Sequence, residues 1–245
     1  MVKLFDYNPQ YYNEDKQVGE RCFFDGKDVY IDFNADLKSF EVTPGAIDSD
    51  FSPAAGRSNF NLFNIEAEPA ELVAEFYVGG PSYEATQTNI SNLLIAAKQC
   101  VIRKEGDIFE YAAVLIDRDS ENTEVEPYYL LSLKFAVIRR KPLVIKKFEK
   151  TAVIYNEGNV PSGVCISISP EKALETFTVA GITIKDLNPG TTYVIDGIAG
   201  RVTANGVNYF AHTDLIDFPK IQPGKNEIVM SEKIPVTVSF YPVFS

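Results

Sequence analysis

The sequence contains no tryptophan and only one histidine, His212, among its 245 residues. Zinc sites rich in histidine need several such ligands, so a single histidine excludes them. No P-loop and no Gly-x-Gly-x-x-Gly pattern opens a helix, and no Gly-x-Ser-x-Gly or Cys-His signature accompanies His212. The common motifs of nucleotide binding and nucleophilic catalysis are therefore absent, and we expect His212 to be a surface or loop residue.

Cysteine is also scarce: Cys22, Cys100 and Cys165 are the three present. The number is odd and the spacings fit no disulfide or metal framework, so we expect free thiols in or near the core. No stretch approaches the roughly 20 apolar residues of a membrane span. The N-terminal residues contain no apolar run of signal-peptide length. We therefore expect a protein that is made in a cytoplasm and is not secreted by a classical signal.

Positive charge is in deficit, with 23 Lys and Arg against 34 Asp and Glu and a net charge of −11. Nucleic acid and anionic membranes are polyanions, so a general affinity for either is not expected. The deficit is uneven along the chain. Residues 1–141 carry 14 basic and 24 acidic residues (net −10), and residues 142–245 carry 9 and 10 (net −1). This asymmetry indicates two units with different surroundings.

The first part of the chain reads mainly as strands. Residues 27–33 alternate Val, Ile and Phe with polar neighbours, and residues 70–80 alternate apolar and polar side chains in the same way. Between them, residues 43–59 are rich in Pro, Gly, Ser and Asp, which is typical of a loop that orders against a partner. We expect a strand at 27–33, a long loop at 43–59 and a half-buried strand at 70–80.

One helix is predicted, over residues 82–100. Ile90, Leu93, Leu94 and Ala97 follow the i, i+3, i+4, i+7 spacing of a buried helix face. Ser82 or Thr86 is expected to cap its first turn. Strands are then predicted at 99–104, 108–117 and 124–139, with a tight turn at 105–107 and a polar loop before the third.

The basic segment 139–147 contains Pro142, and we place the domain boundary there, between residues 141 and 142. The following chain reads as short strands separated by turn residues, every 8–12 residues, which is typical of a β-sandwich. Asn205-Gly206 is the preferred pair for a type I′ turn, so residues 201–204 and 207–210 should form a hairpin. Arg139, Arg140 and Lys141 read as a solvated linker better than as a phosphate-binding patch.

Candidate chemistry is sparse. Asp196 and Asp217 are the carboxylates that a glycosidase in the second unit would use, but sugar sites commonly stack on Trp, which the chain lacks. Asp117, Asp119 and Glu121 could hold calcium, yet their spacing departs from the Asp-x-Asp-x-Asp-Gly loop. We therefore expect a solvated turn at 117–121 and a turn-forming role for Asp196.

The order of these elements resembles the distal tail (Dit) proteins of siphophages and related prophages of Gram-positive hosts. The likeness is clearest in the second unit: Asn156-Glu-Gly158, TFTVAGITIKDLNPG (176–190), YVIDGIAGRVTANG (193–206), FPKIQPGKNEI (218–228) and the last strand, 236–244. The first unit matches more loosely, through the strand at 75–78, the NISNLL helix and the long strand at 128–138. These motifs mark turns and strands, and none marks a catalytic group.

The resemblance implies a mainly β fold: an N-terminal β-rich, ring-forming tail domain with one helix (1–141) and a C-terminal galectin-like β-sandwich (142–245). It implies a structural virion protein and no enzyme, forming a hexameric ring that joins the tail tube to the tip or baseplate. DNA passes through the channel without specific binding. The partners expected are the tail tube protein, a tail-tip protein and a receptor-binding protein, in a tail assembled in the host bacterial cytoplasm. An extended hairpin arm would be formed by 124–139 with 108–117.

No catalytic, cofactor-binding or metal-binding residue and no cofactor is expected. The main alternative is a standalone carbohydrate- or cell-wall-binding sandwich, in which Tyr193 and Tyr209 would replace the galectin Trp as sugar-stacking rings. A hydrolase on a β-sandwich is the third hypothesis, and it requires a cleft with paired carboxylates.

Overall fold

The computed structural model describes residues 20–45, 47–53, 60–123 and 127–245. The chain divides into two compact units, Met1–Ile138 and Arg139–Ser245. The division therefore comes after Ile138, three residues before the boundary predicted after Lys141. Both units are built mainly from antiparallel strands, so the predicted mainly β fold is confirmed.

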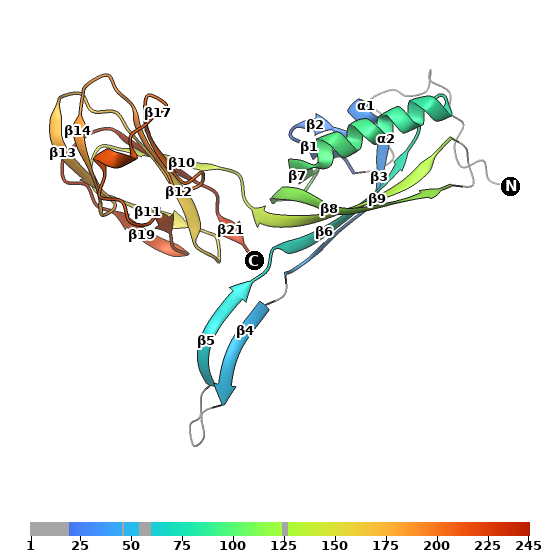
Figure 1. Ribbon diagram of the computed structural model, residues 1–245, viewed down its shortest axis with the longest axis horizontal. Helices are drawn as coiled ribbons and strands as arrows, with labels where there is room; N and C mark the ends of the chain where they lie inside the picture. The colour runs from blue at the N-terminus through green and yellow to red at the C-terminus, as the bar shows by residue number, and fades with distance from the viewer. Residues whose placement is uncertain (1–19, 46, 54–59, 124–126) are drawn as a thin grey trace. The chain divides into compact units, whose positions relative to one another are not determined.

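The first unit is an antiparallel sheet with a helix on one face (Figure 1). Its strands follow the order β2-β1-β7-β8-β9-β6-β3. Their bounds are β1 Cys22–Phe24, β2 Lys27–Asp28, β3 Ala35–Thr43, β6 Ala70–Val78, β7 Gln99–Lys104, β8 Glu110–Asn122 and β9 Tyr129–Arg140.

Strict alternation explains the core of this sheet. In β6 every second residue, from Leu72 to Val78, is fully buried, as predicted for 70–80, and β9 buries Leu131 to Val137 in the same way. Because successive side chains point to opposite faces, one face of the sheet packs against the helix and the other faces away from it. Phe24 joins this core through edge-to-face contacts with Phe76 and Phe135, each with ring centroids 6.0 Å apart.

The main helix, α2 (Tyr83–Ala97), is confirmed with its predicted cap. The Ser82 hydroxyl accepts a hydrogen bond from the backbone N–H of Ala85, at 3.2 Å. Leu93 and Ala97 are fully buried against the sheet, and Ile90 and Leu94 are partly buried beside them. The spacing of these four residues was the sequence signal, and it correctly identified the packed face.

The strand predicted at 27–33 is wrong from Val29 onward, since only Lys27 and Asp28 form a strand. Residues Val29–Phe33 form a one-turn helix, α1, because the Asp28 carboxylate accepts hydrogen bonds from the N–H groups of Tyr30 and Ile31. Val29 and Phe33 are buried one turn apart, so the same apolar residues that suggested alternation satisfy a helical face instead.

The loop predicted at 43–59 is also wrong where the structure describes it. Strands β4 (Ile47–Pro53) and β5 (Phe60–Ala67) pair antiparallel with each other and with no other described strand. They continue the paired strands β3 and β6, as Figure 1 shows. Residues 46 and 54–59 lie outside the described residues. The freestanding hairpin is therefore β4–β5.

The arm predicted from 108–117 and 124–139 is wrong, because β8 and β9 are central strands of the sheet.

The second unit is a β-sandwich. One sheet has the order β10-β20-β12-β15-β16-β17, with β18 paired to β12. The other layer consists of the pairs β11–β19 and β13–β14, which are joined through residues 229–231. The bounds are β10 Val144–Phe148, β11 Ala152–Asn156, β12 Ser162–Ile168, β13 Leu174–Val179, β14 Ile182–Leu187, β15 Tyr193–Asp196, β16 Arg201–Ala204, β17 Val207–Asn208, η2 Phe210–His212, β18 Lys220–Ile221, β19 Gly224–Ile228, β20 Val236–Phe240 and β21 Val243–Phe244.

Alternating side chains from the two layers fill the core of the sandwich. Ile166, Ile168, Phe177, Ile184 and Phe240 are fully buried there. The predicted hairpin is present, with Ala204 paired to Val207 across a two-residue turn. Asn205 (φ 47°) and Gly206 (φ 83°) both take the left-handed conformation that a type I′ turn requires.

Candidate assembly and docking surfaces

The carboxylates considered for catalysis lie in turns or on the surface. Asp196 ends β15, and its Oδ1 accepts the N–H groups of Ile198 (3.0 Å) and Ala199 (2.9 Å), while its Oδ2 lies 3.6 Å from Nε of Arg201. Asp217 is exposed in the loop before β18. Asp196 thus stabilises the turn between β15 and β16, which is the role that the sequence indicated.

His212 is a surface residue, as expected, and it ends the short helix η2. Its ring stacks on that of Tyr209, with centroids 4.3 Å apart, and its Nδ1 lies 3.4 Å from a carboxylate oxygen of Asp186. The Tyr209 hydroxyl donates to the backbone carbonyl of Asp186 at 3.0 Å. These contacts hold η2 against β14 and give His212 a structural role.

Tyr193 does not fit the sugar-stacking role considered for it. Only 1% of the residue is exposed, and its hydroxyl accepts a hydrogen bond from the N–H of Asn188 at 2.8 Å. A sugar ring cannot stack on a side chain inside the sandwich core. That prediction is wrong for Tyr193, because the strand alternation of β15 directs this residue inward.

The acidic residues considered for calcium lie on a strand. Asp117, Asp119 and Glu121 are exposed on β8, where the sequence analysis expected a polar loop, and Asp117 and Asp119 each accept the N–H of the next residue. Within the described part of the chain, no group of three His, Cys, Asp or Glu side chains is placed to hold a metal ion. Likewise, no helix among the described residues is long and apolar enough to cross a membrane.

The three cysteines are free thiols, as predicted. Cys22 and Cys100 are buried in the first unit, and burial raises the pKa of each to about 12. Burial also raises the pKa of Cys165 in the sandwich. All three are therefore protonated at neutral pH, and protonated thiols are poor nucleophiles.

The linker interpretation of residues 139–141 is wrong. The guanidinium of Arg140 lies 3.7 Å from the centre of the Tyr241 ring, and Nζ of Lys141 lies 2.6 Å from the carboxylate of Glu157. Strand β21 pairs with Arg139 and Arg140. The basic residues are thus fixed to the C-terminal strand of the second unit, a long-range pairing that local composition does not reveal.

The sheet of the first unit has an apolar face away from α2. Val114 and Ile116 on β8 and Ile138 on β9 alternate with core residues, and about half of each residue is exposed. The ion pairs Glu71–Lys134 (2.8 Å) and Lys38–Glu75 (3.1 Å) lie at partly exposed positions of β3, β6 and β9. An exposed apolar sheet face bordered by charges is typical of a protein–protein contact surface. We call the face marked by Val114, Ile116 and Ile138 the open face.

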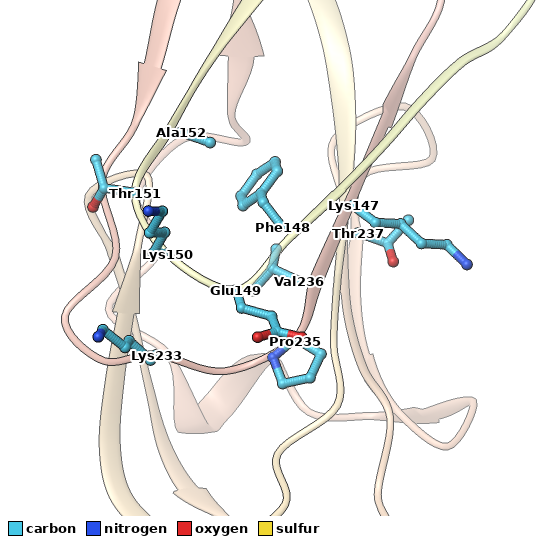
Figure 2. Close-up of a pocket in the computed structure, with 10 residues that line it drawn as sticks. All are labelled: Lys147, Phe148, Glu149, Lys150, Thr151, Ala152, Lys233, Pro235, Val236 and Thr237. Carbon is cyan, nitrogen blue, oxygen red and sulfur yellow. The ribbon is translucent and has the colours of Figure 1, made fainter.

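The second unit has a lysine-lined cleft of about 700 Å³ (Figure 2). It lies between the end of β10, the turn that follows it, and the start of β20. Lys147, Lys150 and Lys233 supply positive charge, and Glu149 is the one carboxylate. The remaining lining residues are Phe148, Thr151, Ala152, Pro235, Val236 and Thr237. We refer to this set as the lysine cleft.

A helix-backed sheet with an open apolar face, joined to a β-sandwich whose candidate catalytic groups lie in turns or at the surface, is typical of structural proteins that act by contact. Comparisons with known proteins show what this arrangement is similar to. Residues 157–244 match the family model of the siphovirus-type tail component, C-terminal domain. No curated protein sequence matches the chain.

Solved structures match nearly the whole chain. The SPP1 Dit (gp 19.1) protein, described as a paradigm of the hub adsorption apparatus in phages that infect Gram-positive bacteria, has 14% identity and a TM-score of 0.69. That match covers 92% of this chain and 99% of the other. Two structures of the phage P2 baseplate in its activated conformation, with Ca and with Sr, have 9% and 11% identity and TM-scores of 0.58 and 0.55. Each covers 91% of this chain and 97% of the other.

The predicted resemblance to phage distal tail proteins is thereby confirmed. Most of the second unit matches the model of that family's C-terminal domain, and the chain as a whole shares the fold of the SPP1 Dit protein. The family-model match over residues 157–244 supports a structural tail or baseplate component, and the solved structures show the shared fold.

Proposed function

We propose that this chain is a distal tail protein that forms a hexameric ring at the end of a phage tail. In this proposal the first unit makes the ring, and the ring joins the tail tube to the tip or baseplate. The second unit faces outward and holds further proteins, among them a tail-tip protein and a receptor-binding protein. The assembly takes place in the host bacterial cytoplasm, and the ring becomes part of the virion without enzymatic activity.

The open face of the first unit is the observation that carries this proposal. Three branched apolar side chains, Val114, Ile116 and Ile138, alternate along its two central strands and remain half exposed in the single chain. Contact between copies would remove this area from water, at a gain of roughly 25 cal/mol for each Å². A ring repeats such a contact at every subunit boundary.

The charge of the first unit supports the passage of DNA through the ring. Residues 1–138, which form the first unit, carry 11 basic and 24 acidic residues (net −13), so a channel lined by this unit repels phosphate groups and does not retain DNA. A filter-binding measurement with double-stranded DNA at low salt tests this point. Retention of the DNA by the assembled protein would contradict it.

The mass in solution tests the ring. A chain of 27.3 kDa predicts a hexamer of about 164 kDa (6 × 27.3), either for the protein alone at high concentration or after co-expression with the tail tube protein of the same genome. Light scattering coupled to size-exclusion chromatography measures this mass. A 27.3 kDa monomer under both conditions, together with saturable binding of host cell-wall polysaccharide, would support the standalone carbohydrate-binding module instead.

A further inference from the structure

The lysine cleft lies beside a strand whose outer edge pairs with no other described strand. Strand β10 is the end strand of its sheet and pairs on one side with β20, from Val144 opposite Phe240 to Phe148 opposite Val236. A strand at the end of a sheet presents a row of backbone N–H and C=O groups that are not used by the sheet. Such a row is a template for one further strand.

The side chains of β10 form a specific pattern along this edge. The strand reads Val144-Ile145-Lys146-Lys147-Phe148, and 55% of Ile145 is exposed. Val144 and Phe148 are partly buried against the sandwich core. Because alternate side chains point to opposite faces, each face of β10 presents one lysine and at least one apolar residue to a neighbouring strand.

The surrounding cleft adds charge of the same sign. In the view of Figure 2, Lys150 and Lys233 lie on one side of the Phe148 ring, and the side chain of Lys147 extends on the other. None of these lysines is ion-paired within the described part of the chain, whereas Lys141 and Lys172 of the same unit each have a carboxylate partner. With three lysines and one carboxylate, Glu149, in its lining, the cleft has a local excess of positive charge in a chain of net charge −11.

We propose that the β10 edge and the lysine cleft bind an extended, acidic segment of another protein, which adds to the sheet as a strand next to β10. Its carboxylates face Lys146, Lys147 and Lys150, and its apolar residues lie against Ile145 and Phe148. A polyphosphate chain would use the lysines alone, and it would leave the apolar lining and the free backbone edge unused. The lining therefore favours a protein segment.

Lysines on an edge strand also protect a protein from indiscriminate strand pairing. That protection and the proposed binding are compatible, because like-charge repulsion excludes basic strands and apolar strands leave the lysines uncompensated. The inference goes beyond the ring and does not depend on it. Peptide binding to the second unit can be measured with the full chain, whether it is a monomer or a ring. A failure of peptide binding can therefore be distinguished from a failure of ring formation.

A designed peptide tests the proposal. Antiparallel to residues 144–150, the complementary sequence is Glu-Thr-Val-Glu-Glu-Ile-Val, with both ends blocked. Titration of the full chain by calorimetry is expected to show saturable binding that weakens as salt is raised from 50 to 500 mM. The peptide with lysine in place of every glutamate should not bind. Absence of saturable binding by the acidic peptide would overturn the proposal.

Two variants locate the site. The double variant Lys147→Glu and Lys150→Glu should weaken peptide binding by about tenfold or more, because two attractions become repulsions. Lys220→Glu is the matched control, since Lys220 is an exposed lysine of the same unit outside the cleft lining, and it should leave the affinity unchanged. Equal affinities for the double variant and the control would overturn the assignment to this cleft.

Two backbone-methylated peptides test strand addition itself. Alternate N–H groups of an added strand point toward β10, so methylation of one alternate set removes the pairing and methylation of the other set leaves it intact. One methylated peptide should therefore bind like the parent and the other should not. If both bind like the parent, or if inorganic polyphosphate displaces the peptide at equal charge, the site recognises charge alone and the proposal is wrong.

Discussion

Replacement of Ile116 by glutamate should separate the ring from the fold. Ile116 lies on the open face, and 54% of the residue is exposed in the single chain. Burying a whole isoleucine side chain is worth about 1.5–3 kcal/mol, so contact between copies would gain roughly half of that, about 1 kcal/mol, from each Ile116. Glutamate loses this gain and leaves an unpaired carboxylate at the contact, which costs about 1–3 kcal/mol more.

The sum, about 2–4 kcal/mol for each subunit boundary, corresponds to roughly a 30- to 1,000-fold weaker contact. Sedimentation velocity over a concentration series measures the shift toward monomer, and thermal unfolding of the monomer should change little because the side chain is half exposed. Ile198→Glu is the control: 52% of Ile198 is exposed, and it lies in the second unit. Loss of assembly in the control with retention in Ile116→Glu would refute the assignment of the ring contact to the open face.

Four further predictions concern single groups. Ser82→Ala should lower the stability of the first unit by about 1 kcal/mol in urea unfolding, because the N–H of Ala85 loses its cap. Asp196→Ala should cost about 1–2 kcal/mol in the unfolding of the sandwich, while Asp196→Asn, which keeps an acceptor oxygen, should cost less. The buried thiols, with pKa raised to about 12 for Cys22 and Cys100, should react with a disulfide reagent at pH 8 only after denaturation, and rapid native reaction would contradict their burial. Burial raises the pKa of Asp36, because the charged carboxylate is poorly solvated in the folded protein. The protonated carboxyl therefore contributes stability below the unfolded pKa, and this stability is lost as pH rises through the folded pKa. Asp36→Asn should accordingly stabilise the protein at pH 7 and have no effect near pH 3.

The parts of the fold that the sequence predicted are those in which one periodicity dominates. Leu72 to Val78 alternate without exception, and the spacing of Ile90, Leu93, Leu94 and Ala97 fits a helix alone. The hairpin at Asn205-Gly206 was predictable because few residue pairs take two successive positive φ angles. In each case a short stretch of chain determines its own structure.

The wrong predictions share a different cause. Residues 29–33 carry a pattern that suits a strand or a helix, and the side chain of Asp28 decides between them. Strand β4 depends on its pairing with β5, and Arg139 and Arg140 depend on a strand more than 100 residues later in the chain, whose first residue is Val243. Backbone pairing between distant segments leaves little trace in local composition, so polar segments of this kind read as loops or linkers.

The candidate surfaces were harder to predict than the fold. The sequence predicted the absence of catalytic motifs, but it did not single out Val114, Ile116 and Ile138, because an exposed and a buried branched residue look alike until the helix-covered face is known. The lysines of the cleft come from two segments, 147–150 and Lys233, which only the sandwich brings together. In the sequence, only the run VIKKFEK (144–150), with its three lysines, pointed to the lysine cleft.

Immunogold electron microscopy of tailed particles produced from the genome that encodes this chain tests the central claim most directly. Antibodies raised against the sandwich unit should label the far end of the tail, with about six copies of the chain per particle by quantitative mass spectrometry. Label along the tail tube, label on the capsid, or absence of the chain from purified particles would contradict its assignment as a distal tail protein.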